Sequence, residues 1–248
     1  MAVERVLLVG ATGNIGVSAA IACLRTKREV LAIVRNQDSA DKFFKHVGTK
    51  EGITVVKADV TTEDGVQGVV DKVKAGALPS FQHVYACVGV WIGTPLHKLS
   101  TEDFRRLMRL GFDANYFAYR ATVPYLLEQN HPNSTWTCCT GAADISGYAG
   151  LTGATQGALV AMLAAAVLEN ERTNIRVNEA YLMVRVEVDS DAEAHGVMTA
   201  SEYAKVYAKI LEKKDIDGCK VIVRGPEDLK ELRFEKKLPQ QAIKHHQN

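Results

Sequence analysis

Short apolar, β-branched runs alternate with longer segments of helical periodicity along nearly the whole chain. The apolar runs cover residues 6–9, 30–34, 53–56, 83–88, 134–139, 176–181 and 219–224, and the helical segments cover residues 14–26, 39–47, 62–75, 101–129, 152–170 and 199–214. Strands without polar alternation, separated by crossover helices, are typical of a parallel sheet covered on both faces. The sequence therefore predicts an α/β fold with a doubly wound parallel sheet.

The length of 248 residues fits one large domain of this kind. We expect a single domain over residues 1–235 that includes the substrate pocket. Residues 236–248 are polar, contain Pro239 and lack apolar periodicity, which predicts a flexible C-terminal tail. We expect His245 and His246 in this tail to be solvated, and the sequence predicts no metal site.

The charge balance narrows the classes of partner. Lys and Arg number 30 against 29 Asp and Glu, a net charge of +1, so the excess of basic charge that nucleic acids and anionic membranes require is missing. The most apolar stretch, residues 157–168, is shorter than the roughly 20 residues of a membrane span. No secretory signal pattern opens the chain. We expect a cytoplasmic protein that acts on a small molecule.

Five cysteines occur without a Cys-x-x-Cys pair, which favours reduced, buried thiols over disulfides or zinc ligands. The adjacent pair Cys138 and Cys139 ends an expected strand. We therefore interpret both as packing residues rather than redox groups.

A glycine-rich loop joins the first expected strand to the first expected helix. It reads Gly10, Ala11, Thr12, Gly13, Asn14, Ile15 and Gly16. Such a loop lets the chain turn tightly, approach a pyrophosphate and pack helix on strand, with the phosphate at the helix N-terminus. This context predicts a dinucleotide-binding site.

The end of the second expected strand indicates which dinucleotide. It carries Arg35 and no Asp or Glu that would hold the ribose 2′-hydroxyl of NAD. A guanidinium suits a 2′-phosphate, so the sequence favours NADP(H). Asp59 and Val60, after the third strand, are expected to contact the adenine, with a helix-capping role for Asp59 as the alternative.

Together these motifs resemble the short-chain dehydrogenase/reductase family, over about residues 4–225. The supporting segments are the glycine loop, Asp59-Val60, the strand that ends at Gly89, the long helix that contains Pro124, and residues 154–159 followed by 174–178. The resemblance implies a single-domain Rossmann fold in which Gly89 lies beside the cofactor. It also implies a homodimer or homotetramer formed through the two long helices, and the small residues of segment 152–170 agree with close helix contact.

The resemblance fails at the catalytic positions. Aligned on residues 154–158, Thr152 stands where the family has its tyrosine, and Gln156 where it has its lysine. The serine position falls on Thr140, or on Cys139 with a loop one residue different. The family's asparagine position falls on Gly111, with Asn115 one turn later.

These changes remove the family's proton donor. A tyrosine can protonate an alkoxide because a nearby lysine lowers its pKa, whereas a threonine hydroxyl is too weak an acid and Gln156 is neutral. One interpretation is a reductase of an iminium or conjugated acceptor, which needs no donor at the accepting atom. A non-redox cyclase, isomerase or lyase is the second, and divergent natural-product members of the family offer analogies for both. A non-catalytic NADP(H)-sensing or partner-binding protein is the third.

Other candidates lie in the segments expected around the pocket. Asp144 and Tyr148, in the loop before the last long helix, are candidate acid–base groups; a turn-capping role is the alternative for Asp144. Trp91 is placed to wall the substrate site. Residues 187–198 correspond to the family's flexible lid, and their alternating acids, with His195, predict a solvated loop. His97 and His131 show no metal-ligand spacing.

Overall fold

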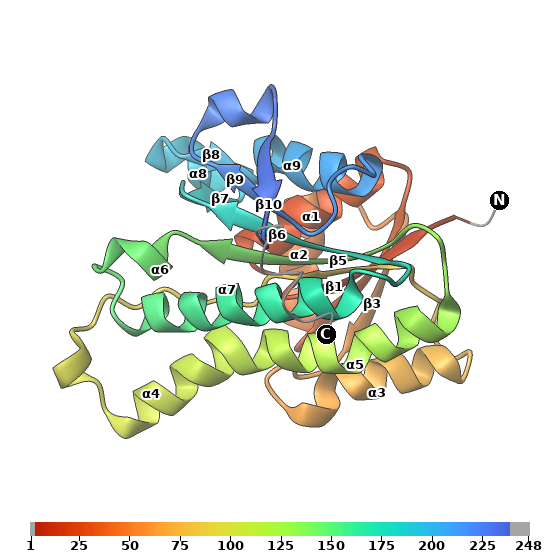
Figure 1. The fold of residues 1–248 in the computed structure, drawn as a ribbon, viewed down its shortest axis with the longest axis horizontal. Coiled ribbons are helices and arrows are strands. Elements are labelled where there is room, and N and C mark those ends of the chain that lie inside the picture. The colour runs from red at the N-terminus through yellow and green to blue at the C-terminus, as the bar shows by residue number, and fades with distance from the viewer. Residues whose placement is uncertain (1–2, 239–248) are drawn as a thin grey trace, which may run out of the picture.

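The computed structural model describes residues 3–238, which form one α/β domain around a single large sheet (Figure 1). The strand order is β10-β9-β6-β5-β4-β1-β2-β3, and every neighbouring pair is parallel except β9 with β10. The strands are β1 (Arg5–Val9), β2 (Glu29–Val34), β3 (Ile53–Lys57), β4 (His83–Ala86), β5 (Ser134–Gly141), β6 (Ile175–Leu182), β9 (Cys219–Val223) and β10 (Arg233–Lys236). The predicted doubly wound sheet is confirmed.

Helices cover both faces of the sheet because each strand sends apolar side chains to both sides. In β1, Val6 and Leu8 pack toward α1 (Asn14–Arg25), α2 (Gln37–Val47) and α9 (Ala200–Glu212). Leu7 and Val9 pack toward α3 (Glu63–Lys74), α5 (Ala114–Gln129) and α7 (Leu151–Asn170). All four side chains are fully buried. This double burial explains the apolar runs in the sequence.

The long helix expected over residues 101–129 is interrupted. It consists of α4 (Thr101–Met108), a π-helical segment (Arg109–Asp113) and α5. A Cβ at Gly111, inside the π segment, would lie 2.6 Å from the Thr155 hydroxyl oxygen on α7. Glycine is therefore required here for the close approach of the two helices.

Helix α7 is the one helix among residues 3–238 that is long and apolar enough to cross a membrane by length and composition. In this fold, Leu159, Leu163 and Ala166 bury one side of it against the core. A core helix of a sheet protein meets the same criterion.

Smaller elements lie near the carboxyl ends of the strands and near the chain end. They are a 3-10 turn (Leu96–Lys98), α6 (Ala143–Ser146), the short pair β7 (Val186–Glu187) and β8 (Met198–Thr199), α8 (Asp189–His195) and a 3-10 turn (Pro226–Leu229).

The structure corrects two expectations in these regions. The segment expected as a solvated loop contains helix α8, whose first turn carries Asp189 and Asp191 and which ends before a left-handed Gly196. Lys236 and Lys237, expected in a flexible tail, belong to the folded domain, because Lys236 pairs with Cys219 in the sheet and the Lys237 side chain is 5% exposed; the expected tail from residue 239 onward, with His245 and His246, lies outside the described residues.

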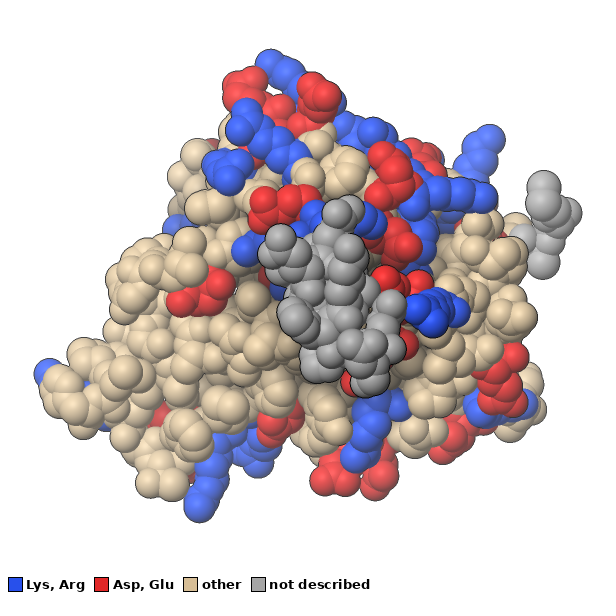
Figure 2. All heavy atoms as spheres, viewed as in Figure 1, with Lys and Arg blue, Asp and Glu red and all other residues tan. Residues whose placement is uncertain are grey.

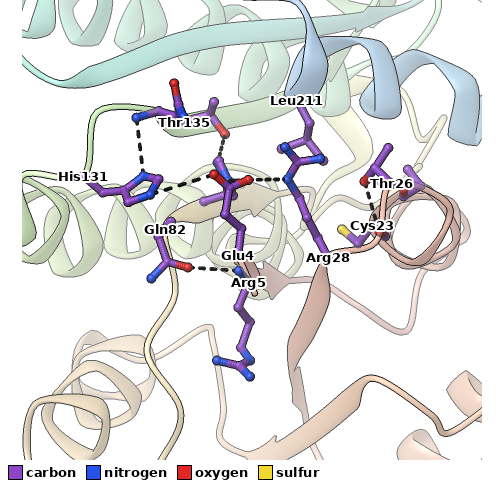
Figure 3. Close-up of polar contacts among 12 residues, drawn as sticks. Glu4, Arg5, Cys23, Thr26, Arg28, Gln82, His131, Thr135 and Leu211 are labelled. Carbon is purple, nitrogen blue, oxygen red and sulfur yellow. Dashed lines mark hydrogen bonds and ion pairs between the residues drawn. The ribbon is translucent and has the colours of Figure 1, made fainter. Parts of the chain in front are cut away.

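A polar cluster ties together the amino ends of the central strands (Figure 3). Glu4 accepts a hydrogen bond from Arg28 Nε at 2.8 Å, and the same carboxylate oxygen lies 3.2 Å from His83 Nε2. Its other oxygen lies 3.8 Å from His131 Nε2. The His83 ring is fully buried and also contacts the Thr135 hydroxyl at 3.1 Å. The amino ends of β1, β2, β4 and β5 are thereby held together, at the end of the sheet opposite the carboxyl ends of these strands.

Candidate active site

The main cavity lies beyond the carboxyl ends of β1, β4, β5 and β6, where open α/β sheets place their ligands. Its volume is about 830 Å³. The lining comprises Gly13, Asn14, Ile15, residues 87–91, residues 139–143, Tyr148, Thr152, Gln156 and residues 182–187. The site thus joins the glycine loop to Thr140, Thr152 and Gln156, the residues that the sequence aligns with the family's catalytic positions.

The glycine loop is shaped as a phosphate cradle. Gly10 has a φ of +96°, and a Cβ at Gly16 would lie 2.2 Å from the Gly10 carbonyl oxygen. Gly13 is the N-cap of α1, no side chain caps this helix, and its first turn carries no acid. The first N–H groups of α1 are therefore free to bind a phosphate, and the loop fits the pyrophosphate of a dinucleotide.

The other cofactor candidates surround this loop. Gly89 lines the main cavity, and Thr12 is half-buried within the loop. Arg35 is exposed just after β2. Asp59 accepts hydrogen bonds from the Thr61 backbone N–H and hydroxyl, which lower the pKa of its carboxyl group. These bonds close a turn before α3, whose N-cap is Thr62, so the helix-capping role foreseen as an alternative is not found. Val60, beside Asp59, is half-buried and packs on the core.

Thr152, at the family's tyrosine position, is used to hold a loop. Its hydroxyl oxygen accepts a hydrogen bond from the Ile92 backbone N–H at 3.0 Å and lies 3.3 Å from the Val90 carbonyl oxygen. The side chain lines the cavity, yet its hydroxyl is turned to the backbone of residues 90–92. The structure therefore assigns Thr152 a positioning role for the loop that carries Trp91.

Gln156, at the lysine position, also faces the cavity. Its Oε1 accepts a hydrogen bond from the Gly141 backbone N–H at 2.9 Å. Within residues 3–238 the Nε2 group makes no hydrogen bond, so it remains a neutral donor for a ligand.

Thr140, at the serine position, belongs to a buried polar chain that the sequence did not reveal. Its hydroxyl donates to Glu179 Oε1 at 2.5 Å, and Glu179 Oε2 pairs with Lys237 Nζ at 2.5 Å. Glu179 is fully buried on β6. A lone acid inside the apolar strand 175–182 was the signal available in the sequence, but its partner lies 58 residues away.

Asp144 and Tyr148 have different surroundings. Asp144 lines a smaller adjoining cavity of about 430 Å³, where its carboxylate accepts a hydrogen bond from the Tyr181 hydroxyl at 2.6 Å. Tyr148 lines both cavities and is 72% exposed. Its ring centroid lies 5.5 Å from that of Trp91, so the two aromatic side chains form a rim at the mouth of the main cavity.

A second polar group on the cavity wall was also missed. Glu187 lines the cavity, and its carboxylate binds His195 Nδ1 at 2.5 Å and the Arg185 guanidinium. The hydrogen bond to His195 is the main cause that lowers the pKa of the Glu187 carboxyl group, and the Arg185 guanidinium lowers it further. The group links the end of α8 to the cavity wall.

Asn115 is not available as a substitute for the family's asparagine. It is fully buried, its Oδ1 accepts from the Val88 backbone N–H at 3.2 Å, and its Nδ2 donates to the Val88 carbonyl at 2.8 Å. Its role is to fix the chain just after β4.

All five cysteines are free. Desolvation raises the pKa of Cys139 to about 12 and that of Cys138 well above its usual value. Thiolates are therefore disfavoured at both residues. Within residues 3–238, no three His, Cys, Asp or Glu side chains are grouped to hold a metal ion.

Comparisons with known proteins agree with this architecture. Residues 4–194 match the family model for short chain dehydrogenase. The chain is 50% identical, over 240 residues, to the short-chain dehydrogenase/reductase iacG of Pestalotiopsis fici, with 94% of this chain and 96% of iacG covered. Among solved structures, ElxO with NADP bound matches with a TM-score of 0.74 at 17% identity, covering 87% of this chain and 94% of ElxO. A short-chain dehydrogenase/reductase from Brucella melitensis matches with a TM-score of 0.69 at 21% identity, covering 84% and 88%. The chain therefore belongs to the short-chain dehydrogenase/reductase family.

Proposed function

We propose that the protein binds NADP(H) and reduces an activated small-molecule acceptor, an iminium ion or a conjugated system, without the family's Tyr/Lys proton donor. The observation that carries the proposal is the state of the two hydroxyls that replace the family's serine and tyrosine. The Thr140 hydroxyl donates a hydrogen bond to Glu179, and the Thr152 hydroxyl is hydrogen-bonded to the backbone of residues 90–92. Neither is free to protonate an alkoxide.

The chain's own residues account for binding and orientation. The N–H groups at the start of α1 would hold the pyrophosphate, and Arg35 would hold the 2′-phosphate. Bound NADPH supplies a hydride. Gln156 Nε2 would donate to the nicotinamide ribose or to a substrate carbonyl, while the rim of Trp91 and Tyr148 would exclude water from an apolar substrate.

Cofactor binding is tested by titrating the protein with NADPH and NADH while energy transfer from tryptophan to the reduced nicotinamide is followed. We expect NADPH to bind more tightly, and Arg35→Ala to weaken NADPH by about 10- to 100-fold with little change for NADH. Arg172→Ala is the matched control because Arg172 is exposed in the turn between α7 and β6, at the amino end of that strand and so opposite the cavity. Failure of both nucleotides to bind would favour the non-redox enzyme or the binding protein.

Reaction class is tested with three probes in the presence of NADPH: 3,4-dihydroisoquinolinium, cyclohexenone and cyclohexanone. We expect reduction of the iminium ion or the enone and none of the simple ketone. Tyr148→Phe should retain this activity, since the exposed phenol is not needed as an acid. Reduction of cyclohexanone that is lost in Tyr148→Phe would contradict the proposal and identify Tyr148 as the proton donor.

We also propose a homodimer or homotetramer formed through α5 and α7, in the cytoplasm, acting on a substrate from secondary metabolism. Ala154, Ala161 and Ala165 are exposed along α7 and leave a flat, small-residue surface. Figure 2 shows few charged side chains over α5 and α7, whereas charges gather over α9 and β10 and along the lower edge. An uncharged surface of this kind suits a second copy of the chain.

A further inference from the structure

The buried chain Lys237–Glu179–Thr140 determines what the floor of the cavity can bind. Lys237 Nζ is a donor only, and an ionised carboxylate is an acceptor only. Glu179 therefore receives hydrogen bonds at both oxygens, from Lys237 at 2.5 Å and from Thr140 at 2.5 Å. Lys237 and Glu179 are 5% and 0% exposed, so water does not compete for them.

This arrangement determines whether the Thr140 hydroxyl donates or accepts a hydrogen bond toward the cavity. A threonine hydroxyl has a single proton, and here it points to Glu179. Thr140 nevertheless lines the main cavity, although it is only 2% exposed, so a ligand group that reaches its hydroxyl oxygen meets a lone pair that can only accept a hydrogen bond. A serine or threonine with a free proton at this place could instead donate to a carbonyl oxygen.

We propose that Thr140 is an acceptor-only subsite and that the ligand group seated on it is an O–H or N–H donor, such as a hydroxyl or a protonated imine, rather than a carbonyl oxygen. Glu179 and Lys237 are positioning residues for this specificity. A carbonyl at the same place would leave both oxygens unpaired, which weakens binding. The inference rests on the proposed function only in taking the main cavity as the substrate site.

A single substitution at Glu179 should turn the Thr140 hydroxyl from an acceptor into a donor toward the cavity. In Glu179→Gln, the ammonium of Lys237 must be satisfied by the amide oxygen, because Lys237 cannot accept. The amide nitrogen then faces Thr140 and donates to it. Thr140 is thereby released to turn its own proton toward the cavity, and the subsite becomes a donor.

The test uses two aromatic probes with the full-length protein, 2-naphthol as a donor and 2-acetylnaphthalene as an acceptor. Dissociation constants are measured by calorimetry, with and without saturating NADP+, which cannot reduce the ketone. Thr140→Val sets the reference ratio of the two constants. We expect the wild type to favour 2-naphthol by about fivefold or more relative to this reference, and Glu179→Gln to favour 2-acetylnaphthalene.

Two further variants separate specificity from folding. Glu179→Gln/Lys237→Met removes the group that orients the amide and should abolish the reversal. Thr137→Val, on the same strand but outside the cavity lining, should keep the wild-type ratio. Thermal unfolding identifies any variant that is not folded, and Thr140→Ser, which keeps the hydroxyl, must then show the wild-type preference.

The results are decisive in each direction. Equal ratios in the wild type and Thr140→Val, an unchanged preference in Glu179→Gln, or no binding of either probe would overturn the proposal. If the ratios shift as expected while NADP+ does not bind, the subsite stands and the proposed reductase function fails.

Discussion

Gln156 Oε1 accepts the backbone N–H of Gly141 at 2.9 Å, which joins the first turns of α7 to the end of β5. This bond turns the Gln156 amide nitrogen away from Gly141. The residue at the family's lysine position thus keeps a donor for a ligand but supplies no charge. Gln156 can therefore orient a ligand, and we expect it not to assist proton transfer.

Restoring the family's tyrosine and lysine at positions 152 and 156 tests whether these positions correspond to the family's proton-donating pair. In Thr152→Tyr/Gln156→Lys, a phenol with a nearby ammonium is available again, and we expect NADPH-dependent reduction of cyclohexanone at least about tenfold above the wild type. Each single variant should stay near the wild-type rate because neither provides an acid with a lowered pKa. A folded double variant that binds NADPH but gains no activity would show that these positions do not correspond to the family's pair.

Alanine substitutions at two glycines of the phosphate loop should have different effects, one on stability and the other on NADPH binding. A Cβ at Gly16 would meet backbone oxygens at 2.2 and 2.5 Å, so Gly16→Ala should lower the free energy of unfolding by about 1–3 kcal/mol or more. At Gly13 the nearest atom would be 3.6 Å away, so Gly13→Ala should cost no more than about 1 kcal/mol, the loss of a favourable N-cap. Gly13 lines the cavity, however, so a methyl group added there should weaken NADPH binding at least about tenfold. Urea unfolding and nucleotide titration measure the two effects, and intact binding by Gly13→Ala would exclude this loop as the phosphate site.

The Glu4 cluster predicts loss of stability in acid. Hydrogen bonding to His83 is the main cause that lowers the pKa of Glu4 from 4.5 to about 2, so its contribution is complete above pH 4.5 and is lost as the pH falls toward 2. Burial lowers the pKa of His83 below 6.5, so the unfolded chain takes up this proton more readily and stability already decreases below pH 6.5.

We therefore expect the free energy of unfolding in urea to fall between pH 6.5 and pH 3. Glu4→Gln should lower stability at pH 7 by about 1–2 kcal/mol, after allowance for solvent screening of this partly exposed carboxylate, and should flatten the acid limb. Glu227→Gln, whose side chain is 78% exposed, should leave the profile unchanged. An identical pH profile in Glu4→Gln would show that the cluster does not control acid stability.

The surface of α7 predicts the effect of a charge on assembly. Ala161→Arg places a guanidinium on the small-residue face and should convert the oligomer to monomers, as measured by size-exclusion chromatography with light scattering. Ala77→Arg, exposed in the loop after α3, serves as the matched control. A wild type that is strictly monomeric would refute the assembly outright.

The sheet could be predicted from the sequence because its strands bury both faces and its helices alternate with them. The sequence also named Thr140, Thr152 and Gln156 as candidates, and the structure places all three along one cavity. The direction of a hydroxyl proton has no sequence signal, since it depends on Glu179, which lies on another strand. Helix α8 was missed because only Ala192 in it is buried, which leaves no apolar periodicity to detect.

Lys237 makes the chemistry of the cavity sensitive to the length of the polypeptide. Removal of the residues after Lys236 would leave every β-strand of the sheet intact. It would also remove Lys237, so the Glu179 carboxylate would remain in the core without a counter-ion. An uncompensated buried charge of this kind costs about 3–5 kcal/mol. Truncation or carboxypeptidase trimming at this end of the chain would thus first change the hydrogen bonding of Thr140, although Thr140 is remote in sequence from Lys237.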